Sequence, residues 1–355
     1  MSSPYMTGIL SLILLVSAVF AATTLNVPNS GSVAVSTRWF DYVVVIMLEN
    51  HSINYTYYNG RGINPCLGNC TYFTSLANNN GLAMNYTNDA IASPSAGDYI
   101  AITSGYGNTQ QQCNAGPRTS GCNSLQLSNI VDSLENAGLG WKVYMEGYPM
   151  ASGCAYSPLG APSYYNPAHN PFVYYSDIQN NPARCAHIVN ANSQTVNQSS
   201  DGCWPTALPI DDLFLRDLNN VTRASNYMWL TPNRIDDLHN CNDVSTGNAW
   251  LQEMIPKILG STLFSTRRAA LFVTFDEPAC TNPPGQPICP PALPQLYSVW
   301  ASNPSAHVTI SGHKSNQVYT HYSALRTIED NWNLPQFYTS TDGSAANMNE
   351  FFLAA

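Results

Sequence analysis

Residues 40–48 read FDYVVVIML, and this stretch decides the class of fold. It is β-branched and apolar at nearly every position, which is typical of a strand covered on both faces. Residues 269–275 (AALFVTF) show the same pattern, and residues 227–231 (YMWLT) predict a third short strand. Strands of this kind lie in the middle of parallel sheets, so the sequence favours an α/β fold.

Helical periodicity follows or precedes these strands, and the alternation supports the same fold class. It appears in residues 125–137, in residues 249–259 despite Pro256, and in residues 322–332. Residues 147–209 are rich in Pro, Tyr, Asn and Cys and lack periodicity, which predicts a loop-rich, disulfide-tied insertion that could cover a pocket. No internal repeat or Gly/Ser linker divides the rest, so we expect one domain over residues 39–355.

The amino-terminal segment and the charge balance indicate an exported protein without nucleic-acid partners. Residues 8–20 are apolar and precede Ala21 and Ala22, as in a secretory signal over residues 1–22. No Lys or Arg precedes the apolar run, so an uncleaved anchor is the alternative; residues 23–38 form a polar linker in either case. The chain has 13 Lys and Arg, 22 Asp and Glu and a net charge of -9, which leaves no basic surface for a phosphate backbone. We expect a secreted or cell-surface protein.

The ten cysteines fit disulfides in an exported chain. Close pairs predict local staples: Cys66 with Cys70, Cys113 with Cys122, and Cys280 with Cys289. The CxxC spacing of a zinc site is absent. Besides the Asn50 triplet, where a glycan would block the predicted pocket, five Asn-x-Ser/Thr sequons, at Asn54, Asn69, Asn85, Asn197 and Asn220, add weak support for export and predict a glycoprotein.

Acidic and amide side chains follow the predicted strands directly. Glu49 and Asn50 follow the first strand, and Asp276 and Glu277 follow the strand at 269–275. Ligand sites in open α/β sheets lie beyond the carboxyl ends of the strands, so these groups predict one shared pocket. Taken singly, each pair is also explained by a helix cap or a solvated turn. Their hard oxygen donors suit Mg²⁺, Ca²⁺ or Mn²⁺ better than Zn²⁺.

A serine and two histidines are candidates for the chemistry. Ser95 lies in SPSAGDY, residues 93–99, just before a helix-compatible stretch, so its hydroxyl could be a nucleophile held at a helix N-terminus. An ordinary N-cap is the alternative for Ser95. His239, in the polar loop after residues 227–231, and His321 could protonate a leaving oxygen or bind phosphate.

These motifs together resemble the phosphoesterase family of secreted acid phosphatases and bacterial phospholipases C, within the alkaline-phosphatase superfamily. The resemblance rests on five pieces in family order: VIMLENHS (45–52), SPSAGDYIAITSG (93–105), TPNRIDDLHNC (231–241), LFVTFDE (271–277) and YTHYSALRTIEDNWNLP (319–335). It implies a three-layer αβα sandwich with a central, largely parallel sheet.

The resemblance also implies roles for individual residues. It makes Ser95 the phosphoryl acceptor. Asp237 and His239 match the family's Asp-x-His, which implies phosphate binding or leaving-group protonation. His321 matches a late His-Tyr-Ser piece, in which a helix-cap role for Ser323 competes with a site role for the histidine. The implied metal ligands are Glu49, Asn50, Ser95, Asp276 and Glu277.

The chain departs from the family in the turn that carries the serine. The family usually has His-Pro-Ser-x-Pro-Asn-Tyr, whereas this chain has Ser93, Gly97 and Asp98 in place of His, Pro and Asn. Asp98 thus becomes a candidate substrate-binding residue. An ionised Asp98 facing phosphate would repel it, which predicts a preference for acid pH.

The sequence therefore predicts a secreted, metal-dependent phosphomonoesterase that acts through a phosphoserine. A phospholipase C or phosphoinositide phosphatase is the alternative within the same chemistry, and its Tyr-rich insertion could contact a membrane. A cell-surface binding protein that keeps the fold but has lost turnover is the alternative of another class.

Overall fold

The computed structural model describes twelve segments of the chain besides Met1. They are residues 37–57, 70–88, 95–107, 113, 115–119, 122, 124–149, 154–158, 164–193, 210–240, 244–278 and 294–354. All lie in one compact unit that extends from Val35 to Ala355. The predicted signal or anchor and nearly all of the predicted linker lie outside the described residues and stay predictions.

A single sheet organises the described residues. Its strand order is β4-β3-β5-β1-β6-β7-β2-β8, and β9 pairs with β2. The strands are β1 (Tyr42–Leu48), β2 (Gly81–Thr87), β3 (Trp141–Met145), β4 (Ile188–Asn190), β5 (Tyr227–Thr231), β6 (Ala269–Phe275), β7 (Gln295–Ala301), β8 (Lys314–Ser315) and β9 (Tyr319–Thr320).

The sheet is largely parallel, as the sequence predicts. β4, β3, β5, β1 and β6 run in one direction, whereas β7 is antiparallel to both of its neighbours. In the β1–β6 pairing Leu48 lies opposite Phe275, so these two strands end at the same level. The residues that follow them therefore start at one edge of the sheet.

The three predicted strands are present. β5 and β6 have the predicted bounds, and β1 begins at Tyr42, two residues later than the apolar run. β1 is buried from Val43 to Leu48, and β5 and β6 are buried throughout. This burial explains their unbroken apolar sequences, because neither face meets water.

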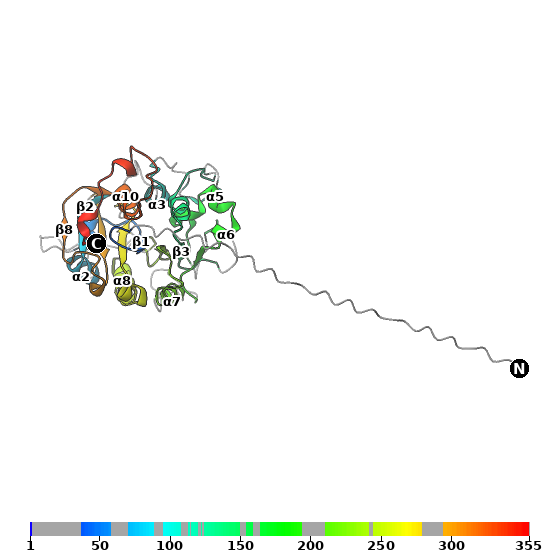
Figure 1. The fold of residues 1–355 in the computed structure, drawn as a ribbon, viewed down its shortest axis with the longest axis horizontal. Coiled ribbons are helices and arrows are strands. Elements are labelled where there is room, and N and C mark those ends of the chain that lie inside the picture. Colours follow the sequence, from blue (N-terminus) through cyan, green and yellow to red (C-terminus); the bar gives the residue numbers. More distant parts are fainter. Residues whose placement is uncertain are drawn as a thin grey trace, which may run out of the picture. The chain divides into compact units, whose positions relative to one another are not determined.

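Helices cover both faces of the sheet, which confirms the three-layer α/β architecture (Figure 1). α3 and α10 pack together on one face, whereas α8 packs with α2, α7 and α9 on the other. No described helix has the length and hydrophobicity needed to span a bilayer. The helices are α1 (Ile53–Thr56), α2 (Thr71–Asn79), α3 (Ser95–Ser104), α4 (Ile130–Asn136), α5 (Ser176–Gln179), α6 (Pro182–Cys185), α7 (Asp212–Leu218), α8 (Val244–Leu259), α9 (Thr262–Thr266) and α10 (His321–Trp332).

The predicted helix over residues 125–137 is wrong in its first part. α4 begins only at Ile130, because Asn129 caps it with a reciprocal capping box to Asp132. Leu125 instead forms a bridge with Tyr175 and donates its N–H to the Tyr174 carbonyl oxygen at 2.8 Å. The extended segment thus joins α4 to the insertion.

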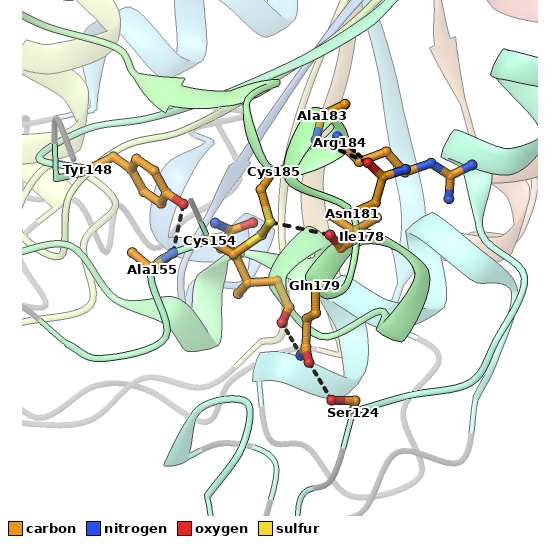
Figure 2. Close-up of a disulfide and its surroundings, with 12 residues drawn as sticks. Ser124, Tyr148, Cys154, Ala155, Ile178, Gln179, Asn181, Ala183, Arg184 and Cys185 are labelled. Atoms are coloured by element: carbon orange, nitrogen blue, oxygen red, sulfur yellow. Dashed lines mark hydrogen bonds between the residues drawn. A yellow bond between two sulfur atoms is a disulfide. The ribbon is translucent and has the colours of Figure 1, made fainter. Parts of the chain in front are cut away.

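The described parts of residues 147–209 consist of short elements joined by loops. They include α5, α6 and the 3₁₀ turns η2 (Pro167–His169) and η3 (Pro171–Val173), while β4 extends the main sheet. The segment therefore contributes a strand to the main sheet, and its role as a cover stays a prediction. A disulfide joins Cys154 to Cys185, and Tyr148 accepts a hydrogen bond from the Ala155 N–H beside it (Figure 2).

Two cysteine and sequon predictions can be compared with the structure. The predicted Cys113–Cys122 staple is confirmed. Cys70 is also disulfide-bonded, while Cys66, Cys280 and Cys289 lie outside the described residues. Among the sequon asparagines that are described, Asn220 is exposed, whereas Asn54 and Asn85 are partly buried.

Candidate active site

Three neighbouring strand ends meet at one place. β5, β1 and β6 are adjacent in the sheet, and the residues after them are joined by backbone hydrogen bonds. Glu49 donates its N–H to the Asp237 carbonyl oxygen at 2.8 Å, and Asp276 donates its N–H to the Leu48 carbonyl oxygen at 3.0 Å. The structure thus brings together the segments that the sequence places beyond the three strands.

The carboxylates of Glu49 and Asp276 form the centre of this site, and both residues are fully buried. Asp276 Oδ1 accepts the backbone N–H groups of Asn50 at 2.8 Å and Glu277 at 2.7 Å. The Asn50 side-chain amide donates to Glu49 Oε2 at 2.9 Å. Asn50 has φ 60°, a left-handed conformation that asparagine adopts more readily than most residues. This turn folds Asn50 back over both carboxylates.

Ser95 is the first residue of α3, and its hydroxyl points at the carboxylates. Ser95 Oγ donates to Glu49 Oε2 at 3.0 Å, and the side chain is 4% exposed. α3 packs on α10 and has every residue buried, so the serine is held firmly. The N-terminus of a ten-residue helix favours negative charge on a group placed there.

Two carboxylate oxygens of the cluster have no hydrogen-bond partner among the described residues: Glu49 Oε1 and Asp276 Oδ2. Burial, and then the charges of Asp276 and Asp237, raises the pKa of Glu49 well above its ordinary value. Burial also raises the pKa of Asp276 to about 6, and burial followed by the charge of Asp276 raises that of Glu277 to about 8. Buried carboxylates with free oxygens fit a divalent cation, which would neutralise them.

His169 is a site residue that the sequence does not predict. Its Nδ1 lies 2.8 Å from Asp237 Oδ2, and its Nε2 lies 2.8 Å from Asn166 Nδ2 and 3.3 Å from Glu49 Oε1. These partners assign the proton to Nδ1 and a lone pair to Nε2. The lone pair faces a carboxylate oxygen, an arrangement that a shared cation would stabilise. The ring of Tyr99 stacks on the histidine at 5.8 Å.

His239 completes a group of three residues that could hold a metal ion. One donor atom each of Glu49, His169 and His239 lie within 4.8 Å of one another. The backbone N–H of His239 donates to Asp237 Oδ1 at 2.8 Å, so Asp237 holds the His239 backbone as well as the His169 ring. Burial lowers the pKa of His239 to about 4 and that of His169 well below its ordinary value, so both rings are neutral near pH 7. Neutral imidazoles are good metal ligands.

Asp237 and Asp236 are adjacent in sequence but point to different places. Burial raises the pKa of Asp237 to about 7, and His239 and Arg234 oppose this rise. Asp236 accepts a hydrogen bond from Asn233 Nδ2 at 2.7 Å and lies against Glu146. Asp237 therefore belongs to the site, whereas Asp236 belongs to a neighbouring buried cluster.

His321 lies behind Asp276, at the first position of α10. Its Nε2 is 2.7 Å from the Asp276 carbonyl oxygen, and its Nδ1 is 3.0 Å from the Tyr86 hydroxyl. Both ring nitrogens are thus engaged, and burial lowers the pKa of this histidine to about 4. The predicted cap role of Ser323 is confirmed, because its hydroxyl accepts the Thr320 N–H at 3.0 Å in a capping box.

Asp98 lies in the first turn of α3 and is fully buried. One of its oxygens is 3.8 Å from His321 Nε2, and the other is 3.5 Å from Asn88 Nδ2. The residue therefore lies beside the site, on the side of His321. Its role in substrate binding stays a prediction.

The sequence predicts the site residues that directly follow strands, because the pattern that predicts a strand also predicts where it ends. The sequence does not predict His169, which is more than 100 positions from Glu49 and lies in a segment without periodicity. The nearest local signal is Asn166 with Pro167, which caps η2 and fixes the turn before the histidine. That signal predicts a turn but gives no distance to the carboxylates.

Comparisons with known proteins agree with this architecture. The model of the phosphoesterase family matches residues 68–335, a range that leaves out the Glu49–Asn50 turn. The chain is 26% identical over 211 residues to a phosphate-repressible acid phosphatase of Penicillium chrysogenum and 27% identical over 211 residues to an acid phosphatase of Aspergillus niger. These matches cover 59% of this chain and 43% and 42% of the two relatives, so the chain spans less than half the length of each.

Solved structures show the same fold at low sequence identity. The lipoteichoic acid synthase LtaP from Listeria monocytogenes has a TM-score of 0.52 at 10% identity, with 85% of this chain and 76% of that chain covered. A protein of the alkaline phosphatase superfamily from Vibrio parahaemolyticus has a TM-score of 0.51 at 11% identity, with 83% and 68% covered. With the family match over most of its length, the chain belongs to the phosphoesterase family.

Proposed function

We propose that this chain is a metal-dependent phosphomonoesterase that forms a phosphoserine at Ser95. The observation that carries the proposal is the Ser95 hydroxyl, which donates to the buried Glu49 carboxylate at the N-terminus of α3. Membership of the phosphoesterase family and relatives named acid phosphatase support a phosphate ester as the substrate.

Glu49, Asn50, Ser95, Asp276 and Glu277 are the proposed metal ligands, and His169 and His239 add nitrogen donors. A divalent ion held there would polarise the phosphoryl oxygens and favour the serine alkoxide. Mg²⁺, Ca²⁺ and Mn²⁺ suit the carboxylates, whereas the two imidazoles also suit Zn²⁺. The two imidazoles therefore weaken the preference for a metal with oxygen ligands alone.

Ser95 Oγ is the proposed nucleophile. Its proton passes to Glu49 Oε2, the atom that already accepts its hydrogen bond. A bond forms between Oγ and phosphorus while the bond from phosphorus to the leaving oxygen breaks. The N-terminus of α3 stabilises the negative charge that develops near Ser95.

Departure of the alcohol and release of phosphate require proton transfer. His239 is proposed to donate to a phosphoryl oxygen or to protonate the leaving oxygen through the ring nitrogen that does not hold the metal, and Asp237 fixes its backbone. Its lowered pKa limits the protonated form to acid pH. Water then attacks phosphorus and gives a proton back to His239, the bond to Oγ breaks, and Ser95 recovers its proton from Glu49. His321 is proposed to act as a positioning residue, since it bonds to the Asp276 carbonyl oxygen.

The alternative substrates differ in what the insertion must contact. His169 reaches the site from residues 147–209, so this segment takes part in the site as well as covering it. A phospholipid or phosphoinositide headgroup is the second candidate substrate, because the insertion is rich in tyrosine. The Asp98 replacement keeps a binding protein without turnover as the third candidate.

Export is part of the proposal. Disulfides persist mainly in oxidising compartments, and two pairs are formed among the described residues, Cys113–Cys122 and Cys154–Cys185. We therefore propose a secreted or cell-surface enzyme.

The test is hydrolysis of an aryl phosphate from acid to neutral pH, with and without a chelator. Ser95→Ala should abolish turnover, whereas Ser104→Ala, at the other end of α3, should keep most of it. Ser104 donates to the Ile100 carbonyl oxygen at the opposite end of α3 from Ser95. Mass spectrometry of acid-quenched protein should show phosphate on Ser95.

Each outcome separates the candidates. Chelator-sensitive turnover that is lost in Ser95→Ala supports the phosphomonoesterase. Release of phosphorylated headgroups from phospholipid vesicles without aryl phosphate hydrolysis points to the phospholipase. No turnover with any divalent metal, together with phosphate ester binding, points to the binding protein.

A further inference from the structure

Three buried carboxyl groups meet outside the candidate active site. Glu146 follows β3, Asp211 precedes α7, and Asp236 lies in the loop after β5; their exposed fractions are 1%, 0% and 0%. No salt bridge of the described residues includes any of them. Ion pairing therefore does not explain why these carboxyl groups are buried.

The three carboxyl groups differ in their hydrogen bonds. Both oxygens of Glu146 accept hydrogen bonds from nitrogen donors, whereas Asp211 and Asp236 have oxygens that no donor reaches. Glu146 Oε2 accepts from the backbone and side-chain nitrogens of Asn233, both at 2.7 Å, and Oε1 accepts from Trp250 Nε1 at 2.8 Å. Both oxygens of Asp211 and Oδ1 of Asp236 have no partner among the described residues. Both aspartates lie within hydrogen-bonding range of Glu146. A proton held in each of these two contacts would turn the repulsion between carboxylates into a hydrogen bond.

The surroundings of the cluster favour protonated carboxyl groups. Burial raises the pKa of Asp211 to about 8 and the pKa values of Glu146 and Asp236 well above their ordinary range. The other ionisable groups that face the cluster, Asp212 and Asp237, are acidic as well. The geometry does not favour a cation in this cluster. Among the described residues, the group whose donor atoms all lie within 4.8 Å of one another is Glu49, His169 and His239, which belongs to the candidate active site.

A second carboxyl pair has the same construction at a different place. Glu329 in α10 and Asp342 are both fully buried. Asp342 accepts from the N–H groups of Phe337 at 2.5 Å and Tyr338 at 3.0 Å and from Thr341 Oγ1 at 3.0 Å, so both of its oxygens have donors. Neither Glu329 oxygen has a partner among the described residues. Glu329 lies against Asp342 and is therefore the proton-carrying member.

The charged groups around this pair do not cancel the effect. Arg326 donates to the backbone carbonyl oxygens of Asp342 and Gly343 and to Asp330 Oδ2, and not to Glu329. Burial, followed by the charge of Asp342, raises the pKa of Glu329 to about 9, with Arg326 opposing and Asp330 adding to the rise.

We propose that these two carboxyl clusters hold protons inside the folded chain, so that the protein is built to be most stable in an acidic medium and loses stability as the clusters ionise. The inference concerns stability and goes beyond the proposed catalysis, since no residue of either cluster contacts Ser95.

The direction of the effect follows from linkage. In the unfolded chain Asp211 and Glu329 ionise near their ordinary pKa values of 3.8 and 4.5, whereas in the folded chain they do so near 8 and 9. Their contribution is therefore intact below about pH 4 and is lost as the pH rises towards 8 to 9. Across that window each group lowers the folding equilibrium constant by up to about tenfold per pH unit.

Thermal unfolding by circular dichroism from pH 4 to pH 9 tests the proposal. We expect the wild-type Tm to fall steadily from acid to alkaline pH. Asp211→Asn and Glu329→Gln replace the proton-carrying groups with neutral ones of the same shape, so both should match the wild type near pH 4 and exceed it at pH 8. Glu253→Gln, whose side chain is 43% exposed, is the control and should follow the wild-type profile.

Several outcomes would overturn the proposal. One is a wild-type Tm that is flat or rises from pH 5 to pH 8, and another is a set of variants whose profiles run parallel to it. A Ca²⁺- or Mg²⁺-dependent rise in Tm that disappears in Asp211→Asn would show a cation in place of the protons. If neither variant folds, the infrared carbonyl band of protonated carboxyl groups decides: it should persist in the wild type at pH 7, and its absence contradicts the proposal.

Discussion

His169 is the residue whose position most changes the description of the site. Its Nδ1 is held by Asp237, which leaves the Nε2 lone pair facing Glu49 Oε1 at 3.3 Å. We predict that His169→Asn lowers metal affinity by about 10- to 100-fold, because a ligand and its supporting carboxylate contact are lost together. Metal content by mass spectrometry and titration calorimetry measure the change.

A matched histidine provides the control for this prediction. His187 lies 2.9 Å from the Trp141 carbonyl oxygen through Nδ1 and stacks on that indole ring, so His187→Asn should leave metal affinity unchanged. Equal metal affinity in the His169→Asn and His187→Asn variants would show that His169 does not bind the metal.

Asp98 is one of the three residues at which this chain departs from the expected serine turn, and it lies 3.8 Å from His321 Nε2. We predict that Asp98→Asn extends activity towards neutral pH, because an ionised carboxylate repels the phosphate dianion and an amide does not. The gain at pH 7 should be about tenfold or more, since close charges in a buried site interact by more than about 1.4 kcal/mol. The pH profile of kcat/KM measures it.

Asp212→Asn is the control for Asp98→Asn, because Asp212 also lies in the first turn of its helix but is exposed. Its profile should match the wild type. Superimposable profiles for Asp98→Asn and the wild type would show that Asp98 does not set the preference for acid.

At the scale of elements, α2 depends on a side chain from another helix. Its N-cap residue, Cys70, makes no side-chain cap hydrogen bond. Asn248 of α8 supplies the acceptor instead, with Oδ1 at 2.8 Å from the Tyr72 nitrogen and 3.2 Å from the Phe73 nitrogen. We predict that Asn248→Ala lowers the free energy of unfolding by about 1–2 kcal/mol, because two buried N–H groups lose their acceptor.

Denaturant unfolding measures this loss. Asn79→Ala, on the exposed end of α2, should change stability by less than about 0.5 kcal/mol. A loss in Asn248→Ala as small as in Asn79→Ala would show that water replaces the missing acceptor.

Element prediction succeeded where burial is uniform. β5 and β6 are apolar because both faces are covered, and their bounds follow from the sequence alone. The sequence does not predict β3 and β7, because polar residues interrupt their apolar patterns. In each strand a polar side chain bonds to a partner that is distant in the sequence. Lys142 in β3 pairs with Asp217 at 2.6 Å, and Ser298 in β7 bonds to Thr274 at 2.7 Å. Such partners cannot be read from local spacing.

At the scale of the whole molecule, the site is assembled from segments far apart in the sequence. Strand ends supply Glu49, Asp276 and Asp237, α3 supplies Ser95, and the insertion supplies His169. The three-layer architecture could be predicted because parallel strands and helices leave periodic signals. The sequence does not predict the contribution of the insertion, because the path of this segment depends on a disulfide and on the pairing of its strand β4 with β3.

The Cys154–Cys185 disulfide closes the part of the chain that carries His169. The sequence separation is 31, against 9 for Cys113–Cys122, and the chain-entropy model gives losses of about 4 and about 3 kcal/mol on removal of the two links. We predict that replacing both Cys154 and Cys185 with Ala lowers stability by about 4 kcal/mol and also weakens metal binding, because His169 lies within the released segment.

The double Ala variant of Cys113 and Cys122 separates the two effects. It should lose a similar amount of stability in denaturant unfolding but keep wild-type metal affinity in calorimetry, since its loop contributes no residue to the proposed metal site. If both variants lose metal affinity in proportion to stability, the metal site responds to global stability. If only the Cys154 and Cys185 variant does so, the insertion acts as a structural arm that holds a ligand against the strand ends.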